Sequence, residues 1–333
     1  MSYIPPFTVS DEITTLVAEI AEYVGHLTAI TDHLPSPQLR KENRIKTIQS
    51  SLAIENNTLS VEQVTAIVDG KRVLGAPNEI QEVKNAIDAY TLLLELNPYK
   101  AKDLLRAHKL MMTNLVRENG CFRSGSVGVF DGERCIHLAP PASRVPELIA
   151  DLIDWVKHTK VHPLISSCVF HHEFEFIHPF DDGNGRMGRM WQTLLLMQWK
   201  PIMAWLPVET IVKEHQQEYY DAIAQSDRVG NSTAFITFML TCLKQALLEM
   251  GKSNQKSNQK SNQKILVAIQ QNPSVTIKEL QAITNLSESG VKKILRQLRA
   301  DGHIQRIGGA KGGHWELLNE KENTKRKRKK KQR

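Results

Sequence analysis

The sequence has few aromatic residues and lacks the features of a membrane or exported protein. Aromatic residues make up 6% of its 333 residues and hydrophobic residues 41%, which is typical of a globular protein in solution. No stretch is long and apolar enough to suggest a bilayer span, and the first residues have neither the basic start nor the apolar run of a signal peptide. We therefore expect a cytoplasmic protein without a membrane span.

Cysteine is also scarce, and its spacing argues against two kinds of site. The four cysteines form neither the close pairs that bind zinc nor the regular framework that forms disulfides. We expect reduced thiols in a reducing compartment. The residues are Cys121, Cys135, Cys168 and Cys242.

Excess positive charge is confined to the last fifteen residues. The net charge is +7, but residues 319–333 contain nine Lys or Arg and two Asp or Glu, so residues 1–318 carry 34 charges of each sign. The sequence before the tail therefore gives no support for a nucleic-acid-binding field. We interpret residues 319–333 as a disordered basic tail, suited to contacts with acidic partners, nucleic acid or a membrane surface.

Apolar residues recur at helical spacing through most of the chain, which predicts a mainly α fold. Within the core, residues 120–141 alone show a hairpin pattern with an Asp-Gly turn. Residues 252–264 repeat the letters KSNQ without an apolar residue, so they form either a flexible tether or a polar helix extension. The chain thus divides into an N-terminal helical region (1–100), a core (101–251), this linker, a small domain (265–318) and the tail.

The small domain resembles a winged helix-turn-helix. Three short helical patterns precede two strand patterns around a glycine-rich turn, and the third helix, SESGVKKILRQLR, would be the recognition helix. Lys292, Lys293, Arg296 and Arg299 are available there for phosphate contacts. DNA binding and docking or dimerising with protein are both open for such a module.

The most informative stretch is HPFDDGNGRMGR, residues 178–189, which lies between two helical patterns. Gly183 and Gly185 permit backbone conformations in which successive N–H groups converge on an anion. The loop leads into a helix N-terminus, which favours a phosphate group. Arg186 and Arg189 lie on one face of that helix and can both bind a polyphosphate.

Three further side chains complete this candidate site. Asn184 adds a donor, and Asp182 is a hard oxygen ligand suited to a magnesium ion that shares phosphate oxygens. Histidine titrates near neutral pH, which makes His178 the candidate general base. The alternative is an ordinary helix-loop-helix corner, but the combination of residues favours a nucleotide site.

This stretch resembles the signature of the Fic family, HPFx(D/E)GNGRxxR, without a departure at any defined position. The resemblance implies a Fic helical-bundle core with a β-hairpin flap, and transfer of AMP from ATP to a hydroxyl side chain of a target protein. It also implies roles for single residues. His178 is the general base, Phe180 is a core anchor, Asp182 holds Mg²⁺, Gly183, Asn184 and Gly185 form an anion hole, Arg186 contacts the phosphates and Arg189 holds the γ-phosphate.

Ser51, Glu55 and Asn56 resemble a second Fic motif, the inhibitory (S/T)xxxE(G/N), on an expected helix of about residues 44–56. By itself, a Ser four residues before a Glu is unremarkable. The resemblance implies that Glu55 pairs with Arg189 and keeps ATP out of position for in-line attack. The enzyme would then be autoinhibited.

The resemblance also points to a flap and to an adenosine pocket. The hairpin from Val127 to Leu138 would hold a target segment by strand pairing, with Ile136, His137 and Leu138 nearest the target backbone. Tyr219 and Tyr220 would line the adenosine pocket, although adjacent tyrosines are otherwise ordinary core and boundary residues.

Three histidines outside the motif look structural. His171 and His172 lack the HExxH order of zinc hydrolases and stand among phenylalanines, which indicates a buried helix. His108 has no second potential ligand at helical spacing. We expect all three to be packed or surface residues rather than metal ligands.

Two classes of function compete. In the first, the protein is a protein adenylyltransferase that uses ATP and Mg²⁺ and modifies target proteins, with self-modification and a homodimer as open options. In the second, it is a DNA-binding regulator whose core only senses nucleotide. His178 and Asp182 favour the enzyme, because a sensor needs no base. Removal of AMP, with Glu55 serving the reverse reaction, remains open.

Overall fold

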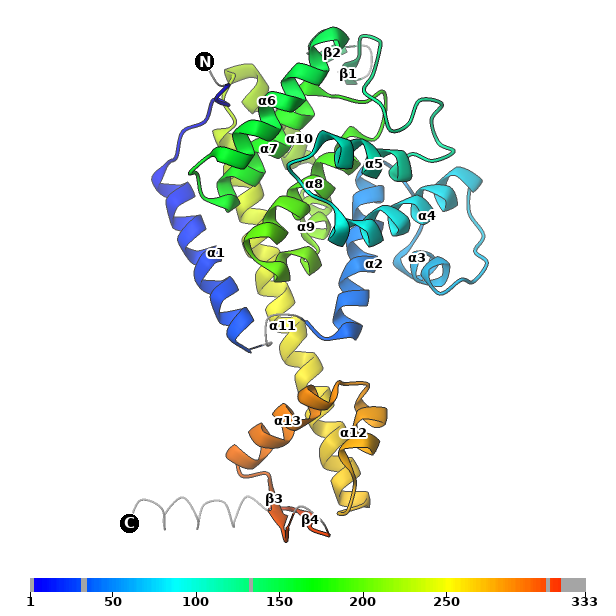
Figure 1. Cartoon of the computed structure of the whole chain (residues 1–333), viewed down its shortest axis with the longest axis vertical. Coiled ribbons are helices and arrows are strands. Elements are labelled where there is room, and N and C mark those ends of the chain that lie inside the picture. The colour runs from blue at the N-terminus through cyan, green and yellow to red at the C-terminus, as the bar shows by residue number, and fades with distance from the viewer. Residues whose placement is uncertain (1–2, 31–34, 132–133, 310–311, 319–333) are drawn as a thin grey trace. The chain divides into compact units, whose positions relative to one another are not determined.

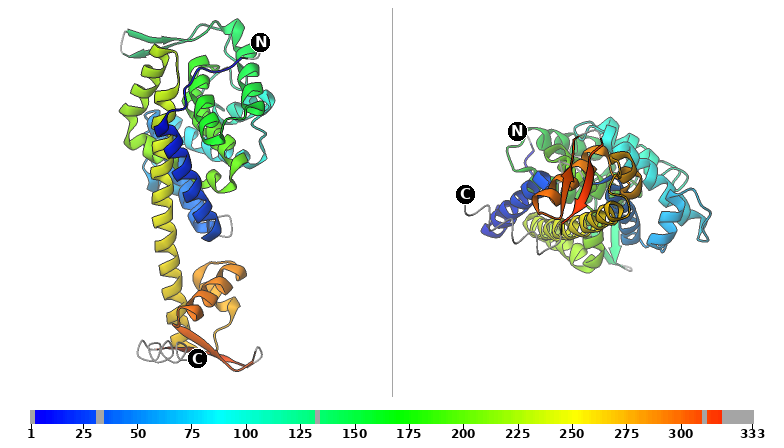
Figure 2. Two further views of the ribbon diagram at one scale, coloured as in Figure 1. Left: turned by 90° about the vertical axis from the view of Figure 1, so that its left-hand side faces the viewer. Right: turned by 90° about the horizontal axis from the view of Figure 1, so that it is seen from below.

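The computed structural model describes residues 3–30, 35–131, 134–309 and 312–318; the side chains of residues 29–30, 129–138 and 254–258 lie outside this description. The chain forms two compact units, Met1–Met250 and Gly251–Arg333. Figures 1 and 2 show the helices of the first unit and the smaller second unit.

The first unit is helical apart from one hairpin within its described residues. Its elements are α1 (Asp11–Ile30), α2 (Pro37–Ile54), α3 (Val61–Val68), α4 (Pro77–Leu92), η1 (Leu93–Glu95), α5 (Ala101–Met111), β1 (Gly128–Asp131), β2 (Arg134–Leu138), η2 (Ala142–Arg144), α6 (Val145–His158), α7 (Pro163–Ile177), α8 (Asn184–Trp199), η3 (Pro201–Trp205), α9 (Val208–Glu214), α10 (Gln216–Val229) and α11 (Thr233–Gln271).

Two helices of the first unit start at a serine whose side chain caps the helix. The Ser36 side chain accepts from the Leu39 N–H at the start of α2, and Ser60 forms a capping box with Gln63 at the start of α3. Helix α4 has no side-chain cap and begins at Pro77, which needs no N–H partner in the first turn.

Helix α8 lies in the middle of the first unit (Figure 1). Its Trp191 and Leu194 are fully buried and share a core cluster with Phe170 and Phe174 of α7. Helix α1 runs alongside α11 (Figure 2) and covers a second cluster, which includes residues of α7 and α11. Glu19 of α1 pairs with Lys244 of α11 at 2.7 Å. The α7–loop–α8 segment is therefore supported from several sides.

The expectation that no segment could span a membrane needs one correction. Thr233–Ser253, within α11, is long and apolar enough by length and composition. Its Phe235, Ile236 and Leu240 are fully buried in the core of the first unit, which accounts for the apolar character. Helix α11 also continues without a break through residues 252–264, so of the two alternatives for the polar repeat the structure has the helix extension.

The second unit has the predicted winged-helix elements. Helices α12 (Ile277–Thr284) and α13 (Glu288–Ala300) precede an antiparallel pair, β3 (Ile304–Ile307) and β4 (His314–Leu317), in which Ile304 faces Leu317 and Ile307 faces His314. The unit has its own core, built from ten buried residues that include Leu280, Val291 and Leu295.

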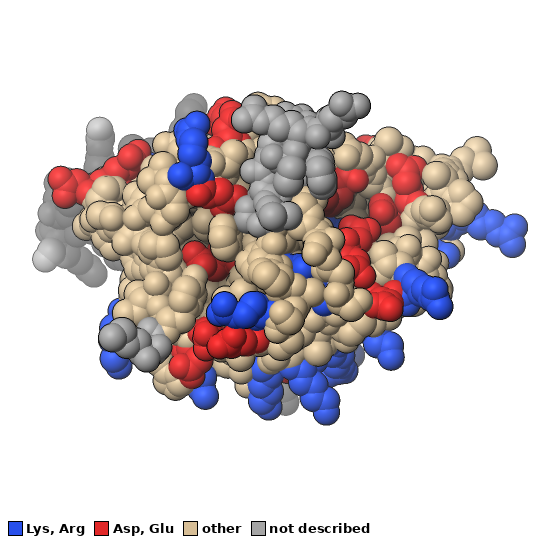
Figure 3. Space-filling view, turned by 90° about the horizontal axis from the view of Figure 1, so that it is seen from above, with Lys and Arg blue, Asp and Glu red and all other residues tan. Residues whose placement is uncertain are grey.

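Lys/Arg and Asp/Glu side chains are interspersed on the face of the molecule shown in Figure 3. No large area of one sign is visible there. This distribution agrees with the equal numbers of positive and negative residues before position 319.

Candidate active site

His178 follows the last residue of α7 and adopts a left-handed backbone conformation, with φ 51° and ψ 62°. Pro179 disfavours continuation of the helix through His178, and the His178 N–H still bonds to Phe174 O at 2.9 Å. The Nδ1 atom lies 3.3 Å from the carbonyl oxygen of Glu175. Because a carbonyl only accepts, this contact favours a proton on Nδ1 and leaves Nε2 as the proton acceptor.

The loop after His178 is braced from inside by Asn184. Its side chain is 2% exposed, accepts from the Phe180 N–H at 2.9 Å and donates to Phe180 O at 2.8 Å. Phe180 is fully buried, as expected for a core anchor. Both ends of this amide bind the loop, so Asn184 fixes the shape of the loop; its expected role as a side-chain donor to the anion stays a prediction.

Both glycines of the loop are required by their surroundings. Gly183 has a φ of 85°, and a Cβ there would lie 2.6 Å from Met112 Sδ. At Gly185 a Cβ would collide with Glu55 Oε1 and lie 3.0 Å from Arg189 Nη1. The space over Gly185, where the sequence predicted an anion, is therefore next to a carboxylate of the protein itself.

Arg189 is held by the end of α2 through three hydrogen bonds. Its Nη2 lies 2.8 Å from Glu55 Oε1 and 3.0 Å from Ser51 O, and its Nε lies 3.1 Å from Ser51 Oγ. Arg189 is 3% exposed. Burial acts to lower the pKa of Arg189, but the negative charge of Glu55 raises it overall. The predicted pair of Glu55 and Arg189 is thus present.

Asn56 closes α2 through its backbone. It has a φ of 69°, its N–H bonds to Ala53 O at 3.2 Å, and its side chain is exposed. Asn and Gly are the residues that most readily adopt this left-handed conformation at a helix end. The Asn of the inhibitory motif therefore shapes the turn that presents Glu55.

Asp182 and Arg186 form a second pair beside the loop. Asp182 Oδ1 accepts from Arg186 Nη2 at 3.0 Å and from the Gly183 N–H at 2.6 Å, while its side chain is 57% exposed. Arg186 is 5% exposed and also lies 3.5 Å from Glu82. Among the described residues its buried Nε has no hydrogen-bond partner.

The two tyrosines occupy different environments. Tyr219 is 2% exposed and its hydroxyl lies 3.1 Å from His171 Nε2, so it is a core residue and not the surface of a ligand pocket. Tyr220 is 43% exposed and donates to Ile54 O at 3.4 Å, beside Glu55. Gln216 donates to the same oxygen at 2.9 Å. Only Tyr220 lies where a nucleotide could reach it.

The hairpin is present as predicted, and β2 contacts α10. Val129 faces His137 and Gly128 faces Leu138, with an irregularity after Val129. Ile136 also lies on β2. The side chains of these three β2 residues, Ile136, His137 and Leu138, are outside the described part of the chain, so their expected contacts with a target remain predictions.

The adjacent histidines of α7 are structural, as expected. His171 Nδ1 lies 2.7 Å from Gln192 Oε1, and His172 Nε2 lies 3.2 Å from Asp227 Oδ1. Both rings are at least 96% buried. In the described part of the chain, no three His, Cys, Asp or Glu side chains gather to hold a metal ion.

Sequence reasoning undervalued His108 and missed Arg123. His108 is fully buried and stacks on Phe180 with ring centroids 3.6 Å apart. Its Nδ1 accepts from the Gly120 N–H at 2.9 Å and its Nε2 faces Asp182 O at 3.0 Å. Burial lowers the pKa of His108 to about 4, so the ring is neutral. Arg123 binds main-chain carbonyls around His178, and no sequence pattern signals such partners.

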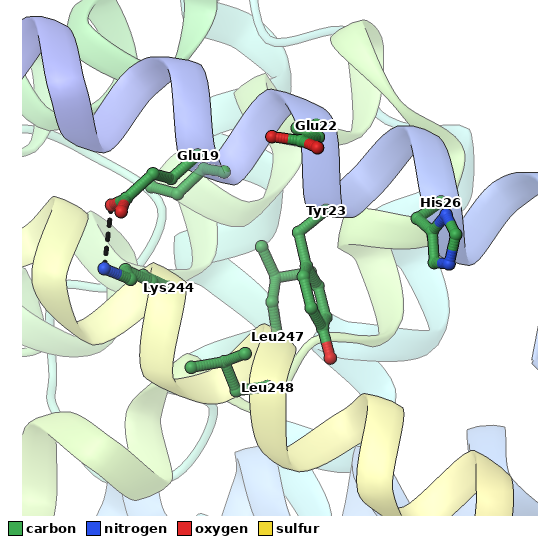
Figure 4. Close-up of a pocket in the computed structure, with 8 residues that line it drawn as sticks. Glu19, Glu22, Tyr23, His26, Lys244, Leu247 and Leu248 are labelled. Atoms are coloured by element: carbon green, nitrogen blue, oxygen red, sulfur yellow. Dashed lines mark hydrogen bonds and ion pairs between the residues drawn. The ribbon is translucent and has the colours of Figure 1, made fainter.

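A separate groove of about 360 Å³ lies between α1 and α11. Figure 4 shows Tyr23 and Leu247 there beside the ion pair of Glu19 and Lys244. None of the residues that line it belongs to the loop of residues 178–189. We therefore do not assign the nucleotide to this groove.

The fold and the loop define a Fic/DOC-type core with an added winged helix. Residues 98–196 match the Fic/DOC family, and residues 259–305 match a winged helix-turn-helix DNA-binding family. A crystal structure of a Fic family protein from Desulfovibrio desulfuricans G20 is 45% identical, with a TM-score of 0.72, over 96% of this chain and 99% of that one. The chain belongs to the Fic family.

Relatives from animals are more distant. The protein adenylyltransferases Fic of Aedes aegypti and Culex quinquefasciatus are 29% and 30% identical over 234 and 219 residues, which cover 66% and 62% of this chain. The chain spans 44% and 41% of their lengths. Residues 134–508 of Fic-1 from C. elegans share the fold at 21% identity, with a TM-score of 0.58 over 74% of this chain and 72% of that one.

Proposed function

We propose that this protein is a protein adenylyltransferase that transfers AMP from ATP to a hydroxyl group of a target protein, and that Glu55 restrains it. The observation that carries the proposal is the arrangement around Arg189. A buried guanidinium beside a glycine-rich helix N-terminus is built for phosphate, and in this structure a carboxylate on the protein holds it instead. The names of the insect relatives support the same activity.

The base is His178. Its Nε2 would take the proton of the target hydroxyl while the oxygen attacks the α-phosphorus of ATP. The bond from the α-phosphorus to the bridging oxygen of the β-phosphate breaks, and diphosphate leaves. The backbone N–H group at Gly185, together with Arg186 and Arg189, would stabilise the negative charge on the phosphates. The Gly183 N–H, expected in the same anion hole, donates to Asp182 Oδ1 in this structure.

A magnesium ion fits the site through Asp182, whose carboxylate is 57% exposed beside Arg186. Magnesium commonly binds through one or two carboxylates plus phosphate oxygens and water, which suits a site with a single carboxylate. When bound, the ion would neutralise phosphate charge. The protein residues around it would orient the nucleotide: Arg186 and Arg189 through their guanidinium groups, and the loop through the N–H of Gly185.

The restraint follows from competition for one cation. Arg189 cannot hold the γ-phosphate while Glu55 lies 2.8 Å from its Nη2. Misplaced phosphates would lower the rate of an in-line transfer steeply, because such reactions depend on alignment. The hydroxyl acceptors include those of target proteins and, in our proposal, of the protein itself.

The test is transfer of radiolabel from α-labelled ATP in the Glu55→Gly background. Adding His178→Ala should lower transfer by about 10²- to 10⁴-fold, the usual contribution of a general base. The control variant adds His158→Ala to Glu55→Gly in place of His178→Ala, because His158 is an exposed histidine of α6. His108 and His171 stay intact in both proteins. Equal transfer with and without His178 would rule out the proposed base.

A second candidate function, DNA binding, is favoured by the match of residues 259–305 to a DNA-binding winged helix. Helix α13 carries the cations named above, of which Lys292 pairs with Glu288 at 2.5 Å. We propose that this unit positions the enzyme on DNA or on a partner protein. DNA binding does not replace the transferase function in our proposal, because DNA binding alone would give His178 and Asp182 no role.

A further inference from the structure

Arg123 is a buried cation whose hydrogen bonds go to the main chain around His178. It is 3% exposed. Its Nε donates to His178 O at 2.7 Å, and its Nη2 donates to Ile177 O at 3.3 Å. In addition, the Arg123 N–H donates to Pro179 O at 2.9 Å. Three consecutive carbonyls at the end of α7 are therefore fixed by one residue.

The same guanidinium also reaches both ends of the hairpin segment. Nη1 donates to Gly125 O at 2.7 Å, and Nη2 donates to Pro140 O. Gly125 precedes β1 and Pro140 follows β2. Because a guanidinium is planar and rigid, its donors fix these two carbonyls relative to the carbonyl of His178.

His178 needs such support, because its backbone is in a conformation that residues with a Cβ adopt rarely. Its φ of 51° is left-handed, and a residue persists there only when its surroundings over-determine the conformation. The proline at the next position removes the helical alternative. The carbonyl that Arg123 Nε binds belongs to His178 itself, so this bond acts directly on the backbone of the base.

The charge of Arg123 supports these hydrogen bonds to carbonyl groups. Burial lowers the pKa of Arg123, and the negative charge of Asp181 acts in the opposite direction. Asp181 is exposed. The donors of the guanidinium that we describe are all spent on carbonyl oxygens, which a lysine could not match, since an ammonium group has three donors at one point.

We propose that Arg123 is a positioning residue for the transfer reaction. It holds the backbone of His178 in the left-handed conformation that aims the imidazole, and it keeps both ends of the hairpin at a fixed place relative to that imidazole. This inference rests on the proposed transferase function and deepens it. It assigns a role in the chemical step to a residue that contacts neither the motif side chains nor a phosphate.

The experiment uses the full chain in the Glu55→Gly background, with Arg123→Lys as the main variant. We expect the rate of label transfer at saturating ATP to fall by about 10- to 100-fold, the scale of a misplaced reactive group. The dissociation constant for ATP should change by less than about twofold, because the phosphate-binding residues are untouched. The matched control is Arg106→Lys, a surface arginine that is 57% exposed, which should leave both quantities unchanged.

A second variant separates positioning from folding. In Arg123→Ala, added guanidinium ion at millimolar concentration should restore part of the transfer rate without raising the melting temperature. Two results would show that Arg123 is only a core residue and would overturn the inference. In the first, guanidinium restores the melting temperature and the rate together. In the second, the rate follows the folded fraction in both variants. An unchanged rate in Arg123→Lys would do the same.

Failure of the underlying function would look different. If the Glu55→Gly protein with Arg123 intact transfers no label to any acceptor, the proposed transferase function fails and this inference falls with it. If that protein transfers label and Arg123→Lys transfers it equally fast, only the role of Arg123 is wrong.

Discussion

Arg189 Nη2 lies 2.8 Å from Glu55 Oε1, and this ion pair joins the phosphate loop to the end of α2. The two partners differ in burial, because the side chain of Arg189 is 3% exposed and that of Glu55 is 33% exposed. Glu55 also caps α2, immediately before the left-handed Asn56. We infer that Glu55 is the partner that moves when ATP binds productively, while Arg189 stays in place.

We expect Ser51 to contribute, together with Glu55, to the proposed restraint of label transfer. Its hydroxyl accepts from Arg189 Nε at 3.1 Å, and a hydrogen bond to a charged group contributes about 1.5–3 kcal/mol. Ser51→Ala should therefore raise label transfer above that of the wild type, but less than Glu55→Gly does. The neighbouring Ser50→Ala is the matched control, because the Ser50 hydroxyl contacts Thr210 instead. Equal transfer by the Ser51 and Ser50 variants would show that Ser51 plays no part in the restraint.

Gly185 lies beside both Glu55 and the space that we propose for phosphate. A Cβ at this position would collide with Glu55 Oε1 and crowd Arg189, and it would also fill space that we assign to phosphate. Gly185→Ala should therefore weaken ATP binding by about tenfold or more, even with Glu55→Gly. Isothermal titration checks this. Gly25→Ala is the control, since a Cβ at Gly25 meets nothing within 4 Å; full ATP affinity in Gly185→Ala would contradict the phosphate assignment.

His172 makes the stability of the protein depend on pH. Burial acts to lower the pKa of His172, but the carboxylates of Asp227 and Glu173 outweigh it and raise the pKa to about 9. An unfolded histidine titrates near 6.5. The interaction of protonated His172 with these two carboxylates therefore contributes its full stability below about pH 6.5. This contribution, on the order of 3 kcal/mol, is lost as the pH rises through about 9.

We expect the melting temperature to fall between pH 7 and pH 9.5. In His172→Gln this part of the fall should disappear, which differential scanning calorimetry of both proteins would show. A variant with the same pH dependence as the wild type would mean that the carboxylates of Asp227 and Glu173 do not hold a proton on His172.

DNA binding by the second unit would be recognisable from its salt dependence. Removing one side chain that neutralises a phosphate should reduce the slope of log affinity against log salt by about 0.9. Arg296→Ala and Arg299→Ala on α13 should each weaken binding of duplex DNA and lower that slope. Lys278→Ala on α12 is the control. If the full-length protein binds no duplex at low salt, the unit is a protein-docking module.

The sequence predicted the loop and its regulator because both are encoded by side chains in short motifs. Arg189 was recognisable because it belongs to a dense motif, and Glu55 because its short motif resembles the inhibitory motif of the Fic family. Arg123 was not, because its partners are main-chain carbonyls, which every residue has. Tyr219 shows the opposite problem: its side chain suggests a ligand contact, but it is buried and bonded to His171. The Asn184 amide binds the main chain of Phe180, which no sequence pattern predicts.

Helix boundaries show a similar division. Ser36 and Ser60 cap their helices with their own side chains, which is chemistry local to the sequence. The polar repeat of residues 252–264 left two alternatives open, since the apolar periodicity that identifies a helix is missing there. In the structure α11 continues through these residues, with an apolar helical segment before them and another after them.

Restraint of the transferase by Glu55 is tested most directly by the rate at which α-labelled ATP modifies protein, compared between the wild type and Glu55→Gly. Mass spectrometry should locate one adenylyl group on a hydroxyl side chain, in the protein itself or in a lysate target. We predict a rate at least about tenfold higher for Glu55→Gly, the effect of roughly 1.4 kcal/mol at the transition state. Equal rates, or modification by neither protein, would contradict this restraint.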